Sequence, residues 1–385
     1  MLFAPSPFAE SFMKKFILST ALAAIAFCLG STPAMAQTKE VKFGCYVPLT
    51  GQLAIFGKSM QSGFEMAIDE FQKSPKSNGI KFTIQCEDDQ GRADDGINIA
   101  RKLVEDKSLM AVIGSWSSTV TLAAGPIYNQ AKMVNITPVS SHPDVTKVGP
   151  YMFRQSLVQS QEGAFNGDTL WKLGARKIAI IGIPNDYGIA NTSLTKRGFE
   201  AKGGKVVFEE LVRPDAQDFR QTLQKAVREN PDWIYIGAFA PQTALMLKQL
   251  RQMGIKTPAY VCAADDTPDL ARLAGADAIE GVHVTVQTNP ALGPELADFY
   301  KRYNARYNRL PDPFASNSYN TAMMMMAIAA GQFPNVDRES LRKGLDDMRS
   351  FDGIFGKIKY EPAARDWEFK LMHGVLQGGS TKIVD

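Results

Sequence analysis

The eight residues VIGSWSST, from Val112 to Thr119, combine the features of an anion-binding loop. An apolar run typical of a buried strand ends at Gly114, and Ser117 and Ser118 precede a segment whose apolar residues have helical spacing. The first backbone N–H groups of a helix have no partner within that helix, so together with the serine hydroxyls they can bind a negatively charged group. This loop therefore predicts a site for a small carboxylate.

A second loop, from Asn135 to Thr146, offers Ser140 and Ser141 after a strand-like run of similar length. In a parallel sheet the carboxyl ends of the strands lie at one edge, where ligands bind. We therefore expect both serines to lie beside the first loop.

Further polar and aromatic residues follow other predicted strands, on two separate sheets. On the first sheet these are Phe56, Trp116 and Val139, and on the second they are Tyr187, Phe239, Asp265 and Asp266. Hydroxyl and N–H groups on one lobe would then face carboxylates on the other. Such complementarity is what a zwitterion requires.

Each of these residues also has a purely structural interpretation. Ser117 or Ser118 can serve only as a helix N-cap, and so can Asp265 or Asp266, because short polar side chains accept hydrogen bonds from free N–H groups. The aromatic side chains of the second sheet can simply pack on a lobe surface. The joint occurrence of all these residues at strand ends favours a binding site.

Catalytic and cofactor motifs have no comparable support. The segment Gly51–Ser59 ends in Gly-Lys-Ser, but five residues separate its glycines where a phosphate-binding P-loop has four. His142 lies beside two serines and Asp144, yet neighbours along one loop do not make the geometry of a catalytic triad. No CxxC or HExxH motif suggests a metal site. We therefore expect neither an enzyme nor a cofactor.

Short apolar runs alternate with amphipathic helical patterns along most of the chain, which predicts right-handed crossovers and parallel sheets. The predicted strands fall into two series: Val41–Val47, Lys81–Cys86, Met110–Gly114 and Met133–Ile136, then Lys177–Ile183, Val206–Val212, Trp233–Ala238, Ala259–Ala263 and His283–Gln287. Helical patterns at Pro294–Tyr307, Phe314–Ala330 and Arg338–Met348 and two β-like runs, Gly356–Tyr360 and Phe369–Leu376, follow. The expected fold class is α/β, with two doubly wound parallel-sheet lobes.

The first 36 residues have the form of a signal peptide whose true start is Met13. Two lysines, an apolar run from Phe16 to Leu29 and the cleavage site Ala34-Met35-Ala36 follow in order. Phe27 occupies a position where a lipoprotein signal ending at Cys28 needs a small residue. Cleavage would leave 349 of the 385 residues in the periplasm, enough for two domains.

The charge balance excludes two classes of partner. The chain has 43 basic and 40 acidic residues, a net charge of +3, so nothing indicates binding to nucleic acid or to a charged membrane surface. Three cysteines follow the signal peptide: Cys45, Cys86 and Cys262. The first two can form a bridge between neighbouring strands, or all three can be buried thiols.

The sequence resembles the type I periplasmic binding proteins of branched-chain amino acid ABC transporters, the leucine/isoleucine/valine-binding protein family. The resemblance extends from Val41 to Asp385. Its marks are Phe56-Gly57, Val112-Ile113-Gly114 with Ser117-Ser118, Ile136-Thr137-Pro138 with Ser141, Tyr187-Gly188 and Phe239.

This resemblance implies a role for individual residues. Ser118 would take the ligand carboxylate, and Ser141 would contact both the carboxylate and the ammonium group. The Val139 carbonyl would accept from the ammonium, and Asp265 or Asp266 would pair with it. Tyr187 would come from the closing lobe. Phenylalanine stands at positions 56 and 239, where tyrosine is common in the family, and the bulk of Trp116 points to a ligand other than leucine, isoleucine or valine.

The resemblance also implies two lobes joined by three crossing segments. We expect residues 37–157 with 288–362 in the N-terminal lobe and 158–287 with 363–385 in the C-terminal lobe. The crossings are expected near Arg154–Leu157, Val286–Thr288 and Glu361–Asp366. Lobe closure would complete the site.

The function expected from the sequence is that of a periplasmic, monomeric solute receptor. It would bind a hydrophobic or branched-chain amino acid and deliver it to the permease and ATPase subunits of an ABC importer. The alternatives are a receptor for an aromatic carboxylate or small amide in the same fold, and a ligand sensor that reports to a signalling partner.

Overall fold

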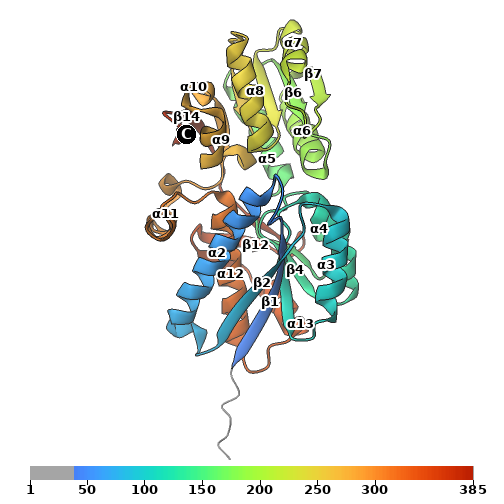
Figure 1. The fold of residues 1–385 in the computed structure, drawn as a ribbon, viewed down its shortest axis with the longest axis vertical. Helices are drawn as coiled ribbons and strands as arrows, with labels where there is room; N and C mark the ends of the chain where they lie inside the picture. Colours follow the sequence, from blue (N-terminus) through green and yellow to red (C-terminus); the bar gives the residue numbers. More distant parts are fainter. Residues whose placement is uncertain (1–38, 385) are drawn as a thin grey trace, which may run out of the picture. The chain divides into compact units, whose positions relative to one another are not determined.

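The computed structural model describes residues 39–384 of the chain (Figure 1). The predicted signal peptide, residues 1–36, and its start at Met13 lie outside the described residues. Within the described range, no helix combines the length and the apolar character needed to cross a bilayer.

The first lobe is built on a five-stranded parallel sheet in the order β2-β1-β3-β4-β5. Its strands are β1 (Glu40–Val47), β2 (Lys81–Asp88), β3 (Leu109–Gly114), β4 (Val134–Thr137) and β5 (Met152–Arg154). Helices α2 (Ala54–Lys73) and α12 (Pro313–Gln332) cover one face, and α3 (Ala93–Glu105) and α4 (Ser118–Gln130) cover the other (Figure 1). Short 3-10 turns at Pro75–Ser77 and Thr146–Val148 and helix α13 (Arg338–Asp347) complete this lobe.

The second lobe contains a seven-stranded sheet in the order β15-β14-β10-β9-β8-β6-β7. Strands β6 (Lys177–Gly182), β7 (Lys205–Leu211), β8 (Trp233–Gly237), β9 (Ala259–Val261) and β10 (His283–Val286) are parallel, and β14 (Met372–Gln377) and β15 (Ser380–Ile383) are antiparallel. Its helices are α5 (Gln159–Lys172), α6 (Asp186–Glu200), α7 (Arg220–Arg228), α8 (Ala240–Gln252), α9 (Pro268–Ala274) and α10 (Ala276–Ile279). The 3-10 turn η3 (Ala263–Asp265) follows β9.

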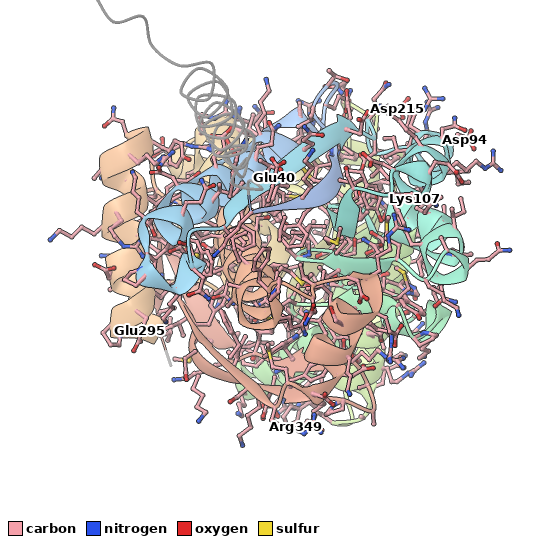
Figure 2. The ribbon with its side chains drawn as sticks, turned by 90° about the horizontal axis from the view of Figure 1, so that it is seen from below. Glu40, Asp94, Lys107, Asp215, Glu295 and Arg349 are labelled. Carbon is pink, nitrogen blue, oxygen red and sulfur yellow. A yellow bond between two sulfur atoms is a disulfide. The ribbon has the colours of Figure 1, made fainter. Side chains whose placement is uncertain are left out.

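A small antiparallel sheet of β11 (Ser350–Gly353), β12 (Gly356–Glu361) and β13 (Asp366–Glu368) lies near the end of the chain. The helix α11 (Pro294–Tyr307) and the 3-10 turn Pro290–Leu292 precede α12. Charged side chains such as Asp94, Glu295 and Arg349 lie at the periphery of the molecule (Figure 2).

Every strand expected from the two series is present, within a few residues of its predicted ends. Four strands were not predicted: β5, β11, β13 and β15. Each has three or four residues and includes a charged side chain, so none forms a recognisable apolar run. Because β13 pairs with β12, the chain returns to the second sheet between Glu368 and Met372, later than the expected segment 361–366.

A disulfide joins Cys45 to Cys86, and Cys262 is a buried free thiol. Cys45 and Cys86 are directly opposed in the parallel pairing of β1 and β2. The structure thus selects the bridge over the alternative of three buried thiols.

Removing this disulfide is expected to destabilise the protein. The bridge closes a loop with a sequence separation of 41 residues, so the double variant Cys45→Ala/Cys86→Ala is expected to lose about 2–4 kcal/mol in the free energy of unfolding. Urea denaturation measures this loss. Dithiothreitol should lower the stability of the wild type and leave the double variant unchanged; a wild type that does not respond to reduction contradicts the prediction.

A buried ion pair fastens β13 to β5. The Arg154 side chain is fully buried, its Nε lies 2.8 Å from Asp366 Oδ1, and its Nη2 donates to the same oxygen. Arg154 Nη1 donates to the backbone carbonyl oxygen of His142 at 2.6 Å. One guanidinium therefore ties together the end of β5, the small sheet and the loop that follows β4.

Candidate functional site

A pocket lies between the two lobes, and its walls come mostly from residues just beyond the carboxyl ends of strands. It is lined by Trp116, Ser117, Ser118, Val139, Ser141, Ser156, Leu157, Glu162, Asn185, Tyr187, Phe239, Ala263, Ala264, Gln287, Pro313, Phe314 and Asn317. Its cavity of about 50 Å³ has room for a few water molecules. The position is the one at which open α/β sheets bind ligands.

The N-terminus of α4 forms the anion-binding end of this pocket. Ser117 is the N-cap: its Oγ accepts a hydrogen bond from the N–H of Val120 at 3.5 Å, and its own N–H donates to Ser115 Oγ at 3.2 Å. Ser118 is the first helical residue, lines the pocket, and has no side-chain hydrogen bond to another residue between 39 and 384. The capping interpretation therefore applies to Ser117, and Ser118 remains available to a ligand.

A buried network holds this loop from behind. Asp89 Oδ2 accepts a hydrogen bond from Ser115 Oγ at 2.6 Å, and the Ser115 carbonyl accepts from Thr137 Oγ1 and Ser140 Oγ. Ser140 Oγ also lies 2.6 Å from Thr121 Oγ1. Burial raises the pKa of Asp89 to about 6.

This network corrects the prediction for Ser140. The sequence placed both serines of the second loop at the ligand, but the Ser140 hydroxyl points into the network and only Ser141 lines the pocket. Val139 lines the pocket as predicted. The Ser141 carbonyl accepts from the N–H of Gln159, which connects this loop to α5.

Aromatic rings form the apolar wall. Trp116 lines the pocket and stacks on Phe56, with ring centroids 4.6 Å apart and planes 5° apart. The ring centroid of Phe239, in the second lobe, lies 4.7 Å from that of Trp116 and 4.8 Å from that of Tyr187. Phe314 packs edge-on against Phe56. Phe56 itself does not line the pocket; it supports Trp116 from behind.

The acidic residues predicted to pair with an ammonium group are not at the pocket. Asp265 is fully buried, with Oδ2 accepting a hydrogen bond from Thr243 Oγ1 at 2.9 Å, and Asp266 Oδ1 accepts from Thr381 Oγ1 at 2.5 Å. Burial raises the pKa of both carboxyl groups, that of Asp266 to about 7. Neither caps α9, whose N-cap is Thr267.

Sequence reasoning missed several polar residues that line the pocket, namely Ser156, Glu162, Asn185, Gln287 and Asn317. Glu162 lies in the first turn of α5 and is 1% exposed. Burial raises the pKa of Glu162 to about 7. Ser156 and Gln287 lie in the segments Arg154–Leu157 and Val286–Thr288, where the sequence predicted that the chain crosses between the lobes. Their position in these segments is the sequence feature that could have identified them. For Glu162 no pattern in the sequence gives such a signal.

The packing of α5 on α6 sets the position of Glu162. Glycines at positions 163 and 167 of α5 face α6 so closely that a Cβ atom would lie 2.6 Å from the Leu194 backbone in the first case and 2.3 Å from the Gly198 backbone in the second. Only glycine permits this approach. The close packing brings Asn191 of α6 within hydrogen-bonding distance of Glu162.

Two lobes with parallel sheets, three chain crossings and a polar pocket at the facing strand ends define a type I periplasmic binding protein. The family model described as "Periplasmic binding protein" matches residues 40–368, so the chain belongs to this family. The resemblance inferred from the sequence is therefore confirmed.

Individual relatives agree with this assignment. The chain is 28% identical over 353 residues to the Leu/Ile/Val-binding protein homolog 1 of Brucella suis, covering 91% of this chain and 92% of the relative. It is 30% identical to a putative branched-chain amino acid ABC transporter from Rhodospirillum rubrum, with a TM-score of 0.69 and coverage of 90% and 100%. The structure of a leucine binding protein from Thermotoga maritima has a TM-score of 0.83 at 26% identity, with coverage of 90% and 98%.

Proposed function

We propose that this protein is the solute-binding component of an ABC importer and that its ligand is an amino acid, hydrophobic or branched-chain. Its curated relatives include Leu/Ile/Val-binding protein homologs that match over nine-tenths of their length. The aromatic wall of Trp116, Phe239 and Phe314 suits an apolar side chain.

The single observation that carries this proposal is the opposite character of the two ends of the pocket. The N-terminus of α4, with Ser118, offers N–H and hydroxyl donors from the first lobe. The carboxyl group of Glu162 reaches the same pocket from the second lobe. An α-amino acid carries the complementary pair of charges. Four or five charge-assisted hydrogen bonds at about 1.5–3 kcal/mol each, less the cost of immobilising the ligand, are sufficient for micromolar affinity.

Because the ligand-binding groups are divided between the lobes, closure around the ligand completes the site. We propose that a first lobe of residues 39–157 with 288–368 and a second lobe of residues 158–287 with 372–384 close about the three crossings, and that a permease with its ATPase subunits recognises the closed monomer. Export through the predicted signal peptide would deliver the protein to the periplasm. We propose binding without catalysis, since the pocket serines have no histidine among the residues that line the site.

A panel of the common amino acids tests the proposal. Binding of the correct ligand is expected to raise the melting temperature by mass action, and to change tryptophan fluorescence because Trp116 lines the pocket. Differential scanning fluorimetry at millimolar ligand, followed by titration calorimetry, measures both affinity and stoichiometry. A panel in which no amino acid shifts the melting temperature would refute the assignment.

A receptor for an aromatic carboxylate or a small amide is the second candidate. The rings of Trp116, Phe239 and Tyr187 favour it, because all three line the pocket and a flat aromatic ligand can pack against them. The same panel should therefore include benzoate and benzamide. Binding of benzoate with no response to any amino acid would select this candidate.

A further inference from the structure

We infer that Glu162 is the counter-charge for the ligand's ammonium group, and that it makes the site select α-amino acids over carboxylates that lack an amino group. This inference rests on the proposed function. It assigns the ammonium site to helix α5, in place of the two aspartates that follow β9.

The lining of the pocket supports this assignment. Glu162 is the only acidic residue among the lining residues of the described chain. The turn η3 contributes Ala263 and Ala264, which bring methyl groups and backbone to the pocket, while Asp265 and Asp266 bind Thr243 and Thr381 elsewhere. The segment where the sequence placed the acidic partner therefore has no carboxylate to offer the ligand.

The hydrogen bonds of Glu162 suit an ionised carboxylate. Its Oε1 accepts from the N–H of Ala263 at 2.8 Å, and its Oε2 accepts from Asn191 Nδ2 at 3.1 Å. A carboxylate has about four acceptor sites, so each oxygen retains a free site. An ammonium group, which has three N–H donors, can occupy these sites.

Further hydrogen bonds orient Asn191, the side chain that donates to Glu162. Asn191 Oδ1 accepts from Tyr235 OH at 2.7 Å, and Tyr235 OH in turn accepts from Asn166 Nδ2 at 2.8 Å. This chain determines which end of the Asn191 amide faces Glu162. Its NH₂ group is directed at the carboxylate, so the site is arranged in advance for a negative charge on Glu162.

No cation within the described chain neutralises that charge. Glu162 forms no ion pair with a lysine, arginine or histidine between residues 39 and 384, and none of these residue types lines the pocket. A buried carboxylate without a cationic partner is costly, whereas pairing it with a cation and satisfying its remaining acceptor sites recovers that cost. The ligand is the group that can supply the cation.

The pairing predicts a pH dependence of amino acid affinity. Burial raises the pKa of Glu162 to about 7 in the empty protein, so below pH 7 the carboxyl group must lose a proton before it can pair with the ammonium. Affinity should therefore fall by up to about tenfold per pH unit below 7. The groups that face Glu162 are Asp265 and Cys262 near η3, Tyr187 of α6 and Tyr235 of β8, and burial raises the pKa of each well above its usual value.

The test uses the variant Glu162→Gln, with Asp265→Asn and Asp266→Asn as matched controls that remove an acid outside the pocket. Titration calorimetry compares leucine with isocaproate, alanine with propionate, and phenylalanine with phenylpropionate; in each pair the second compound lacks only the amino group. For the amino acid that the wild type binds, Glu162→Gln should weaken binding by about 100-fold or more, because one partner of a buried charge pair is lost. Binding of the matching acid should stay unchanged or tighten.

The outcomes of these titrations test the role of Glu162 and the proposed function separately. Glutamine has nearly the same shape and removes the charge, but its NH₂ group must face either the Ala263 N–H or the Asn191 NH₂ group. The melting temperature of the empty variant and its binding of the matching acid therefore serve as the test that it remains folded. The pH dependence below 7 should also disappear in Glu162→Gln. The inference is overturned if the amino acid binds this variant within about threefold of the wild type, or if Asp265→Asn or Asp266→Asn produces the selective loss instead. A wild type that binds no amino acid overturns the proposed function itself.

Discussion

Replacing Ser118 by aspartate is expected to abolish binding of α-amino acids while leaving the protein folded. Ser118 is the first residue of α4 and lines the pocket. The new carboxylate would occupy the free N–H groups of the helix and repel the ligand carboxylate, and like charges placed together cost several kcal/mol, which corresponds to a loss of about 1,000-fold or more. The helix dipole favours an acidic side chain at this position by about 0.3–1 kcal/mol. Because Ser118 is buried and a buried carboxylate without a cationic partner is costly, the melting temperature of Ser118→Asp is measured together with its binding.

Two comparisons make this result specific. Ser118→Ala removes one hydrogen bond to a charged group and should weaken binding by only about 10–100-fold. Leucinamide keeps the ammonium group of leucine but lacks its carboxylate, so it should lose much less affinity than leucine in Ser118→Asp. Calorimetry on leucine and leucinamide measures both effects. If Ser118→Asp binds leucine within about tenfold of the wild type, the carboxylate does not bind at the N-terminus of α4.

Replacing Arg154 by methionine is expected to cost about 3 kcal/mol in the free energy of unfolding, near the lower end of the range for a broken buried ion pair. The Arg154 side chain is 0% exposed and that of Asp366 is 19% exposed. Methionine preserves much of the packing volume but leaves the Asp366 carboxylate without its cation and the His142 carbonyl without its donor. Urea denaturation followed by circular dichroism measures the change.

A double-mutant cycle separates the ion pair from the packing. Asp366→Asn alone should also destabilise the protein, since it leaves the charge of Arg154 buried and unpaired. The double variant Arg154→Met/Asp366→Asn should then be more stable than the sum of the two single losses predicts. Additive losses would show that the two side chains contribute independently and would contradict the assignment of a coupled pair.

Local sequence patterns were sufficient to predict the fold. The alternation of apolar runs with helical spacing gave the strand series, and α11 begins and ends at the predicted residues Pro294 and Tyr307. Strands β5 and β13 were not predicted because each has three residues that include a charged side chain, so no apolar run marks them as the all-apolar strand β9 is marked.

The sequence placed at the site those residues whose position depends on a single local segment of the chain. Ser117 and Ser118 follow a strand and begin a helix, so their position depends only on local structure. The sequence placed Ser140 and Ser141 together at the ligand, whereas in the structure only Ser141 lines the pocket. The direction in which a loop side chain points is decided by its hydrogen-bond partners, here Thr121 and the Ser115 carbonyl, which lie in other segments.

Local patterns in the sequence were enough to predict two parallel-sheet lobes with loops at facing strand ends, and to select the loop from Val112 to Thr119 as a candidate anion site. Tertiary structure alone decided the rest. The bridge between Cys45 and Cys86 needs the register of β1 against β2. Glu162 reaches the pocket only because α5 packs closely on α6 and faces η3, while Asp265 and Asp266 turn away to partners far along the chain. Local periodicity cannot reveal these relations, because each depends on contacts between segments widely separated in sequence.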